Sequence, residues 1–200
     1  MNIGIDIDDT IVDTITPIIK YANIYSQKLG LNVKCEDEFG LASTAHYLED
    51  TYGWDEKTAL RFFDEYYKLV LEECKIRKNA SKVLQKLKAE GHTINFITAR
   101  FPIEPHCDTE KITKKTLSKY NIPYDNLVMN VQKKAEDCKK LNIDIFIDDS
   151  YEQCKLLENN GIKTFLITTK MNNKLKENDI EKASSWNDLY SKINNLKNQK

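Results

Sequence analysis

The stretch that decides the fold opens the chain and reads MNIGIDIDDT, residues 1–10. Alternating isoleucines over Ile3–Ile7 are followed at once by acidic residues and a threonine. An apolar run of this length favours a buried strand, and in open parallel sheets the residues at the carboxyl ends of strands bind ligands. We therefore expect a first strand over Ile3–Ile7, with Asp6, Asp8 and Thr10 placed at a functional edge.

Four more apolar runs along the chain predict four further strands. They span Thr93–Thr98, Asn126–Asn130, Ile143–Ile147 and Lys163–Thr168. Helical patterns lie between them, and Gly91 and Gly161 each stand after a helical pattern and before a strand, where a left-handed helix cap needs glycine. This alternation predicts an α/β fold with a Rossmann-like parallel five-stranded sheet and helices on both faces.

One segment breaks the alternation. More than eighty residues separate the first two strands, far more than a single crossover helix requires. The pattern over residues 14–77 is helical throughout and includes helices over Ser43–Tyr52 and Asp55–Cys74. We therefore predict an inserted helical subdomain at 14–77, with residues 1–13 and 78–200 forming the α/β core. A last helix containing Trp186 is expected in the tail, which is rich in Lys and Asn.

The composition narrows the class of protein. The chain has 200 residues, 40% of them hydrophobic and 30% charged, which is typical of a globular domain. Thirty basic and thirty-one acidic residues leave no basic footprint for a nucleic acid polymer. The sequence has neither a secretory signal at its start nor an apolar run of about 18 residues, and its five cysteines include no C-x-x-C pair. We expect a cytoplasmic protein with reduced thiols and no membrane partner.

Polar residues also follow the second and fourth strands. The second ends in ITAR, residues 97–100, and the fourth in IDDS, residues 147–150. Lys133 and Lys134 precede the fourth strand on a short predicted helix. Because carboxyl ends of parallel strands share one edge, these groups should meet Asp6 and Asp8 there.

Such a group of carboxylates predicts a metal site. Asp6, Asp8, Asp148 and Asp149 would repel one another unless a cation lay among them, and oxygen ligands favour Mg²⁺ or Ca²⁺ over zinc. Mg²⁺ commonly shares its coordination shell with a substrate phosphate. Phosphate oxygens would find partners in the Thr98 hydroxyl, the backbone N–H groups after it and a lysine. Asp6 could then attack phosphorus, while a carboxyl two residues later protonates the leaving oxygen and activates water.

These motifs, in this order, resemble those of the haloacid dehalogenase superfamily. The resemblance covers Asp6-x-Asp8-x-Thr10, Thr98, Lys134 and Asp148-Asp149. It implies that Asp6 is the nucleophile and a metal ligand, and that Asp8 is the acid and base and offers its backbone carbonyl to the metal. Asp149 would bind the metal directly with Asp148 behind it, or the two would exchange roles. Lys134, or alternatively Lys133, would bridge the phosphate and Asp6.

Within that superfamily, ITAR and IDDS look most like the 5′(3′)-deoxyribonucleotidases and their bacterial relatives. This resemblance implies that the inserted helices form a cap and that the cofactor is Mg²⁺. It also implies that the substrate is a small phosphomonoester, with (deoxy)nucleoside monophosphates expected first, held by Thr98, Ala99 and Lys134. Arg100 would either hold the substrate with them or stack over the rim. The cap aromatics, Tyr47 and Trp54 among them, would either pack the cap or face the substrate.

Three alternatives stay open at this point. A phosphatase for sugar phosphates or another small metabolite could use the same core under a different cap. A mutase would also use Asp8, whereas dehalogenase chemistry needs neither Asp8 nor Asp149. A non-catalytic phosphate-binding module is a different class of protein, and the complete set of motif residues argues against it.

Overall fold

The computed structural model describes residues 1–41, 46–103, 107–173 and 179–197. Its main sheet has the strand order β5-β4-β1-β6-β7-β8, and all neighbouring strands are parallel. The five predicted strands are confirmed with shifts of one or two residues at their ends. They are β1 (Asn2–Ile5), β4 (Thr93–Ile97), β5 (Asn126–Val128), β6 (Ile145–Asp148) and β7 (Lys163–Ile167).

A sixth strand, β8 (Lys182–Ala183), was not predicted. It extends the sheet beyond β7, where Leu166 donates its N–H to Glu181 O at 2.9 Å and Thr168 donates to Ala183 O at 2.8 Å. Two residues with one charged side chain carry no strand periodicity that a sequence could reveal. The strand forms because the outer edge of β7 offers it backbone hydrogen-bond partners.

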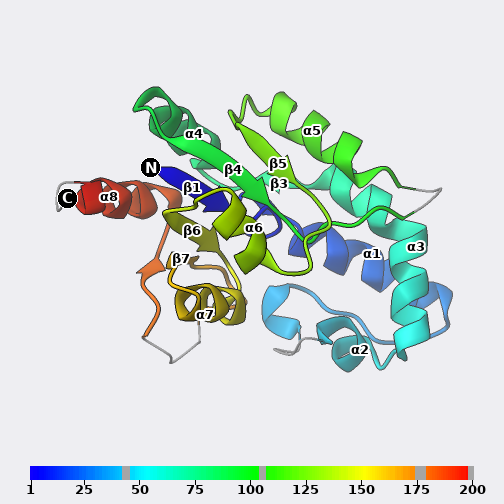
Figure 1. The fold of residues 1–200 in the computed structure, drawn as a ribbon. Helices are drawn as coiled ribbons and strands as arrows, with labels where there is room; N and C mark the ends of the chain where they lie inside the picture. Colours follow the sequence, from blue (N-terminus) through cyan, green and yellow to red (C-terminus); the bar gives the residue numbers. More distant parts are fainter. Residues whose placement is uncertain (42–45, 104–106, 174–178, 198–200) are drawn as a thin grey trace.

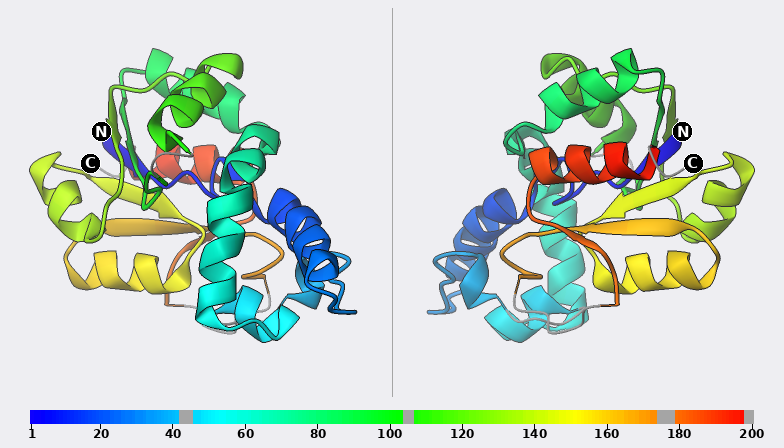
Figure 2. Two further views of the ribbon diagram at one scale, coloured as in Figure 1. Left: turned by 90° about the vertical axis from the view of Figure 1, so that its right-hand side faces the viewer. Right: turned by 90° about the vertical axis from the view of Figure 1, so that its left-hand side faces the viewer.

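Helices cover both faces of the sheet, as predicted, and each face has its own apolar core (Figure 1). One face packs against side chains of α4 (Ala80–Ala89), α5 (Thr109–Lys119) and α8 (Trp186–Lys197). The other packs against α6 (Lys134–Lys140) and α7 (Tyr151–Asn159). Figure 2 shows α8 lying along the sheet on the side away from the helices of residues 15–73.

The predicted helix caps before the strands have a clear conformational reason. Gly91 and Gly161 have φ angles of +84° and +81°, in the left-handed region that side chains with a Cβ rarely enter. Each glycine turns the chain from the end of a helix into the following strand. The sequence position of these glycines therefore fixes where α4 and α7 stop.

Between the first two large strands the chain forms a mostly helical segment beyond the carboxyl ends of the sheet (Figure 1). It contains α1 (Ile15–Lys28), the short 3-10 helix η1 (Glu38–Gly40), α2 (Tyr47–Tyr52) and α3 (Glu56–Glu73). The helix expected over Ser43–Tyr52 begins at Tyr47 among the described residues, and positions 43–45 lie outside them. Asp55 caps α3, because its carboxylate accepts the N–H of Thr58 at 2.8 Å.

The prediction that residues 14–77 are wholly helical is wrong at their end. Lys75–Ile76 forms β3, which pairs antiparallel with β2 (Val12–Asp13). Lys75 and Ile76 are residue types that could extend a helix. They form a two-stranded ribbon instead, because the chain re-enters the core beside the point where it left it. This ribbon is the connection between the helical segment and the sheet.

Aromatic rings fill the interior of the helical segment. Trp54, on the loop between α2 and α3, stacks on Tyr52 at 4.8 Å and packs edge-on against Tyr25 at 5.4 Å between ring centroids. Phe62 lies 5.5 Å from the same indole ring. Such ring pairs stabilise beyond the area they bury. The segment therefore has a hydrophobic core of its own, separate from the two cores beside the sheet.

Two further expectations can be compared with the structure. All five cysteines are buried and free of disulfides, as expected of reduced thiols. Among the helices of the described ranges, none combines the length and apolarity that crossing a membrane would demand.

The close packing around Gly4, in the middle of β1, predicts that a larger residue there lowers the stability of the fold. A Cβ atom added there would lie 2.4 Å from a ring carbon of Phe146 on the neighbouring strand β6. Both residues are buried, so the ring has little room to retreat. We expect Gly4→Ala to lower the free energy of unfolding by about 1–3 kcal/mol in urea denaturation, as overpacked cores do.

Gly4→Ala combined with Phe146→Leu is the control for this steric origin. The smaller side chain removes the ring edge, so the alanine should cost less in that background than in the native chain. Equal costs in both backgrounds would contradict the proposed clash.

Candidate active site

Three carboxylates meet where β1 and β6 end. Asp6 follows β1, Asp148 is the last residue of β6 and Asp149 comes directly after it. Each offers one oxygen, and these oxygens lie within 4.8 Å of one another. Parallel pairing of β1 with β6 causes this proximity, since Asp6 also donates its N–H to Ile147 O at 2.9 Å. We call this edge, with the end of β4, the rim.

Lys134 supplies the positive charge at the rim. Its Nζ lies 2.7 Å from Asp6 Oδ1 and 2.7 Å from Asp148 Oδ2, and the side chain is buried. The Lys134 Nζ also lies over the ring of Phe146, 5.5 Å from its centroid. The alternative lysine, Lys133, is exposed and pairs with Glu136 at 3.2 Å. Lys134 is thus the lysine that reaches the carboxylates.

The electrostatics of this group fit a bound cation. Burial raises the pKa of Asp6 to about 7, against the influence of Lys134 and with repulsion from Asp148 and Asp8 adding to it. Burial, followed by repulsion from Asp148 and Asp9, also raises the pKa of Asp149 well above its ordinary value. One lysine does not compensate all of these charges. A divalent ion among the three carboxylates would favour their ionised forms, and an all-oxygen donor set suits a hard cation.

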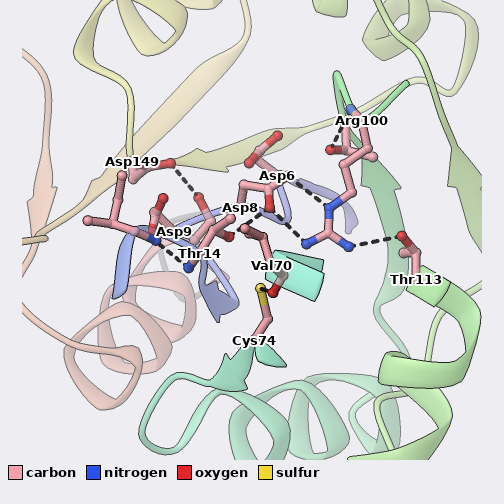
Figure 3. Close-up of polar contacts among 12 residues, drawn as sticks. Asp6, Asp8, Asp9, Thr14, Val70, Cys74, Arg100, Thr113 and Asp149 are labelled. Carbon is pink, nitrogen blue, oxygen red and sulfur yellow. Dashed lines mark hydrogen bonds and ion pairs between the residues drawn. The ribbon is translucent and has the colours of Figure 1, made fainter. Parts of the chain in front are cut away.

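Asp8 lies in a different environment, paired with Arg100 (Figure 3). Arg100 donates from Nε to Asp8 Oδ2 and from Nη2 to Asp8 Oδ1, both at 2.8 Å, and from Nη1 to Thr113 Oγ1 at 2.9 Å. Thr14 donates its hydroxyl to Asp8 Oδ1 at 2.7 Å. Burial works to raise the pKa of Asp8, but the guanidinium and this hydroxyl hold it below its ordinary value.

Asp9 and Asp13 shape the turn that leaves the rim. Asp9 has a φ of +53°, and its Oδ1 accepts the N–H groups of Thr14 and Ile15 at 3.0 and 3.2 Å, at the start of α1. Asp13 accepts the N–H and hydroxyl of Thr16 at 3.1 and 2.7 Å. Such local bonds from aspartate are typical of turns and helix starts. They give both residues a structural role.

A cavity of about 400 Å³ opens over the rim. Its walls are formed by Asp6, Asp8, Asp9, Thr98, Ala99, Val131, Gln132, Lys134, Asp148, Asp149, Ser150 and Gln153. Every predicted site residue except Arg100 is among these described lining residues. Arg100 is buried behind Asp8 instead, so its guanidinium is directed at the carboxylate. Thr98 is fixed through its backbone, since its N–H donates to Val128 O and its carbonyl accepts from Val131, both at 3.0 Å.

The helical segment contributes tyrosines near Asp8. Burial, followed by the carboxylates of Asp9 and Asp8, raises the pKa of Tyr47, and burial followed by Asp8 raises the pKa of Tyr67. Both hydroxyls therefore remain protonated beside the site. Tyr67 also stacks on Phe101 of the core, with ring centroids 5.9 Å apart. Trp54, by contrast, belongs to the interior of the helical segment.

Thr10, expected at the rim from its motif, is connected there to residues whose role sequence reasoning missed. Thr10 donates its hydroxyl to Asp149 Oδ1 at 3.1 Å, and Trp186 donates its indole N–H to Thr10 O at 3.1 Å. Arg77 donates to Asp9 O at 2.7 Å and to Thr168 O at 3.0 Å. Trp186 lies 176 residues along the chain from Thr10, and Arg77 lies 68 residues from Asp9. A single tryptophan in a polar tail was the one available signal.

The fold and the rim define a class of protein. The structure is similar over 98% of both chains to that of a predicted phosphatase from Clostridium acetobutylicum, with a TM-score of 0.70 and 18% identity. It is also similar to a haloacid dehalogenase-like hydrolase from Streptococcus pneumoniae, with a TM-score of 0.68 and 15% identity over 96% of this chain and 97% of that one. The fold is that of the haloacid dehalogenase superfamily.

Sequence comparison places the chain more narrowly. Residues 1–199 match the family described as 5′ nucleotidase, deoxy (pyrimidine), cytosolic type C protein, and the chain belongs to that family. A nucleotidase of Clostridium acetobutylicum is 29% identical over 198 residues, which cover 98% of this chain and 95% of the relative. The predicted resemblance is confirmed, and the protein is a phosphoric monoester hydrolase.

The buried Asp8–Arg100 pair predicts a specific energetic coupling. Arg100→Met would leave the Asp8 carboxylate and Thr113 without their cationic partner. We expect a loss of about 3 kcal/mol in the free energy of unfolding, at the lower end for a broken buried pair because Asp8 keeps 31% of its side chain exposed. The same change made in an Asp8→Asn background should cost at least about 1 kcal/mol less.

Lys114 is the matched control, since it pairs with Glu110 at 2.5 Å but both side chains are more than half exposed. Lys114→Met should change the free energy of unfolding by no more than about 0.5 kcal/mol. If Arg100→Met cost no more than this control, the pair would not be the constraint inferred here.

Proposed function

We propose that this protein is a Mg²⁺-dependent 5′-nucleotidase that hydrolyses phosphomonoesters through an aspartyl-phosphate on Asp6. The observation that carries the proposal is the meeting of Asp6, Asp148 and Asp149 with Lys134 on the floor of a 400 Å³ cavity. A carboxylate nucleophile, a cation for the phosphate and oxygen ligands for a metal are the components that this chemistry requires. The family and the nucleotidase relative support the same reaction class.

Asp6 acts as the nucleophile in this proposal. Lys134 holds Asp6 Oδ1, so the orientation of the carboxylate is fixed before substrate binds. An Asp6 oxygen forms a bond to phosphorus while the bond from phosphorus to the leaving oxygen breaks. Thr98 and Lys134, both on the cavity wall, contact the transferred phosphoryl oxygens.

Asp8 moves the protons. It donates one to the leaving oxygen in the first step and takes one from the attacking water in the second. The bidentate Arg100 contact favours ionised Asp8, which is the form that accepts a proton from water. Proton donation in the first step therefore requires Asp8 to turn away from Arg100 and take up a proton from solvent when substrate occupies the cavity, and the proton taken from the attacking water in the second step replaces the one donated.

Mg²⁺ would be held by Asp6 and Asp149, with the backbone carbonyl of Asp8, and with Asp148 behind them. When bound, it neutralises charge on the phosphoryl oxygens and on the carboxylates around it. The Asp148 side chain already has partners in Lys134 and in the N–H of Ser150, 2.9 Å from Oδ1. Within the described residues, the Asp149 carboxylate accepts a hydrogen bond from the neutral Thr10 hydroxyl and no ammonium group contacts it, which favours Asp149 as the direct ligand.

Residues 14–77 serve as the cap in this proposal. The β2–β3 ribbon joins them to the core, and Tyr47 carries a protonated hydroxyl toward Asp8 and Asp9. A cap that closes over the cavity excludes water from the phosphorylated Asp6. The aromatic ring of Tyr47 is suited to a nucleobase, since stacking one base on a ring contributes about 1–3 kcal/mol to binding. Pyrimidine (deoxy)nucleoside 5′-monophosphates are the substrates proposed first.

A panel of monophosphates tests this function. With Mg²⁺ present, nucleoside 5′-monophosphates should exceed sugar phosphates in kcat/KM by roughly 5- to 150-fold, the value of one stacking contact. Phosphate release measures each rate. Asp6→Asn is the blank and should remove all measurable turnover, because the uncatalysed reaction is extremely slow.

Tyr47→Ala separates the two parts of the proposal. It should reduce the preference for nucleotides and leave p-nitrophenyl phosphate turnover nearly unchanged. A native enzyme that prefers sugar phosphates would reject the nucleotidase assignment, whereas normal turnover by Asp6→Asn would reject the phosphatase mechanism.

Metal removal gives an independent prediction. EDTA should abolish phosphate release, Mg²⁺ should restore it and Ca²⁺ should not. Calcium takes a looser shell of 6–8 oxygens and would let Asp6 bind through both oxygens, which misdirects the attacking one. Full activity after exhaustive chelation, checked by elemental analysis of the sample, would contradict the metal requirement.

A further inference from the structure

A buried asparagine in the loop after β7 contacts the backbone of Asp149. We call Asp148 and Asp149 the metal motif. Asn172 donates both amide N–H groups, one to Asp149 O and one to Ile167 O, each at 2.8 Å. Its Oδ1 accepts the N–H of Thr169 at 2.9 Å. The side chain is 6% exposed, and these three bonds use both donors and the acceptor of the carboxamide.

Thr169 completes a reciprocal arrangement with Asn172. The Asn172 N–H donates to Thr169 Oγ1 at 3.2 Å, while the Thr169 N–H donates to the asparagine side chain. Thr169 is also buried, at 8% exposure. The loop after β7 therefore presents the carboxamide in one orientation before any ligand arrives. We call Thr169 and Asn172 the clasp.

The two carbonyls that the clasp holds belong to neighbouring strands. Ile167 ends β7, and Asp149 directly follows β6. The last β6–β7 register pair is Asp148 with Leu166, so ladder pairing stops just before Asp149. Asn172 continues the connection where the backbone ladder ends, which fixes the path of the chain at the metal motif.

Asp149 is then held on two sides. Its carboxylate accepts the Thr10 hydroxyl at 3.1 Å, and its carbonyl accepts the Asn172 amide at 2.8 Å. Thr10 is in turn fixed by the Trp186 indole at its carbonyl, 3.1 Å away. A residue held at its backbone carbonyl and at its carboxylate has little freedom to move away from Asp6, and partners behind metal ligands orient them in this way.

We propose that Asn172 is a positioning residue for the metal site: with Thr169, it sets the place of Asp149 and thereby the affinity for the divalent cation. This inference rests on the proposed function, in which Asp149 is a direct ligand. Asn172 does not touch substrate or metal. Its effect is on how tightly the cation binds, not on the chemical step once the cation is in place.

The test compares Asn172→Ala with Asn173→Ala, its exposed neighbour, whose backbone N–H donates to Thr169 O and is kept in the alanine variant. Mn²⁺ is titrated into each protein, and the free ion is counted by electron paramagnetic resonance, which needs no turnover. Asn172→Ala should weaken the Mn²⁺ Kd by about 10- to 100-fold, the usual effect of losing a partner behind a metal ligand. Asn173→Ala should change it by less than about twofold.

Activity gives the second readout. For Asn172→Ala, the Mg²⁺ concentration for half-maximal rate should rise by a similar factor, while kcat at saturating Mg²⁺ stays within about threefold of native. Thr169→Val, which keeps the shape and removes the hydroxyl acceptor, should shift Kd in the same direction by less. This variant keeps the test decisive if Asn172→Ala fails to fold.

Asp149→Asn separates the two hypotheses. If the native protein binds Mn²⁺ and Asp149→Asn loses it, but Asn172→Ala and Thr169→Val bind as tightly as native, the clasp proposal is overturned and the metal site stands. A fall in kcat without any change in Mn²⁺ Kd would also overturn it. If the native protein binds no Mn²⁺, the proposed metal site fails and the clasp proposal fails with it.

Discussion

Carboxylates crowded onto neighbouring strand ends are the constraint on which the rest of this structure depends. Asp6, Asp148 and Asp149 converge because β1 and β6 are parallel and adjacent, so the sheet that forms the core also forces acidic groups together. Lys134 reaches them at 2.7 Å from the start of α6 and is buried there. One ammonium leaves negative charge uncompensated, and a divalent cation among the carboxylates would relieve this excess.

Asp6 and Asp8 are two residues apart in sequence, but at the rim they lie in opposite electrostatic environments. Asp6 is buried among like charges, which favours its neutral form in the metal-free chain, whereas Asp8 faces the guanidinium of Arg100 and stays ionised. Pairs of acids driven apart in this way commonly have different catalytic roles. Here the division comes from three parts of the chain: the loop after β1 supplies both acids, α6 supplies the lysine and the loop after β4 supplies the arginine.

The helical segment is attached directly to this site. Thr14 at the start of α1 donates to Asp8, and Arg77, which follows β3, donates to the carbonyl of Asp9. Both connections between the segment and the sheet therefore contact the loop after β1. A movement of the helices would therefore act on Asp8 and on the turn beside it. The aromatic interior around Trp54 packs the helices of this segment against one another.

The sequence by itself determined the α/β class, five of the strands and most of the lining of the cavity. Those features rest on local patterns: apolar runs with acidic ends, glycines after helices, and short motifs in a fixed order. Only the tertiary structure decided that Arg100 holds Asp8, that Lys134 and not Lys133 reaches the carboxylates, and that β8 extends the sheet. It also decided that Asn172 and Trp186, in or beside a polar tail, hold the loops of the rim. The Asn172 and Trp186 bonds to Asp149 and Thr10 join residues 23 and 176 positions apart, and no local pattern records which distant carbonyl a side chain will meet.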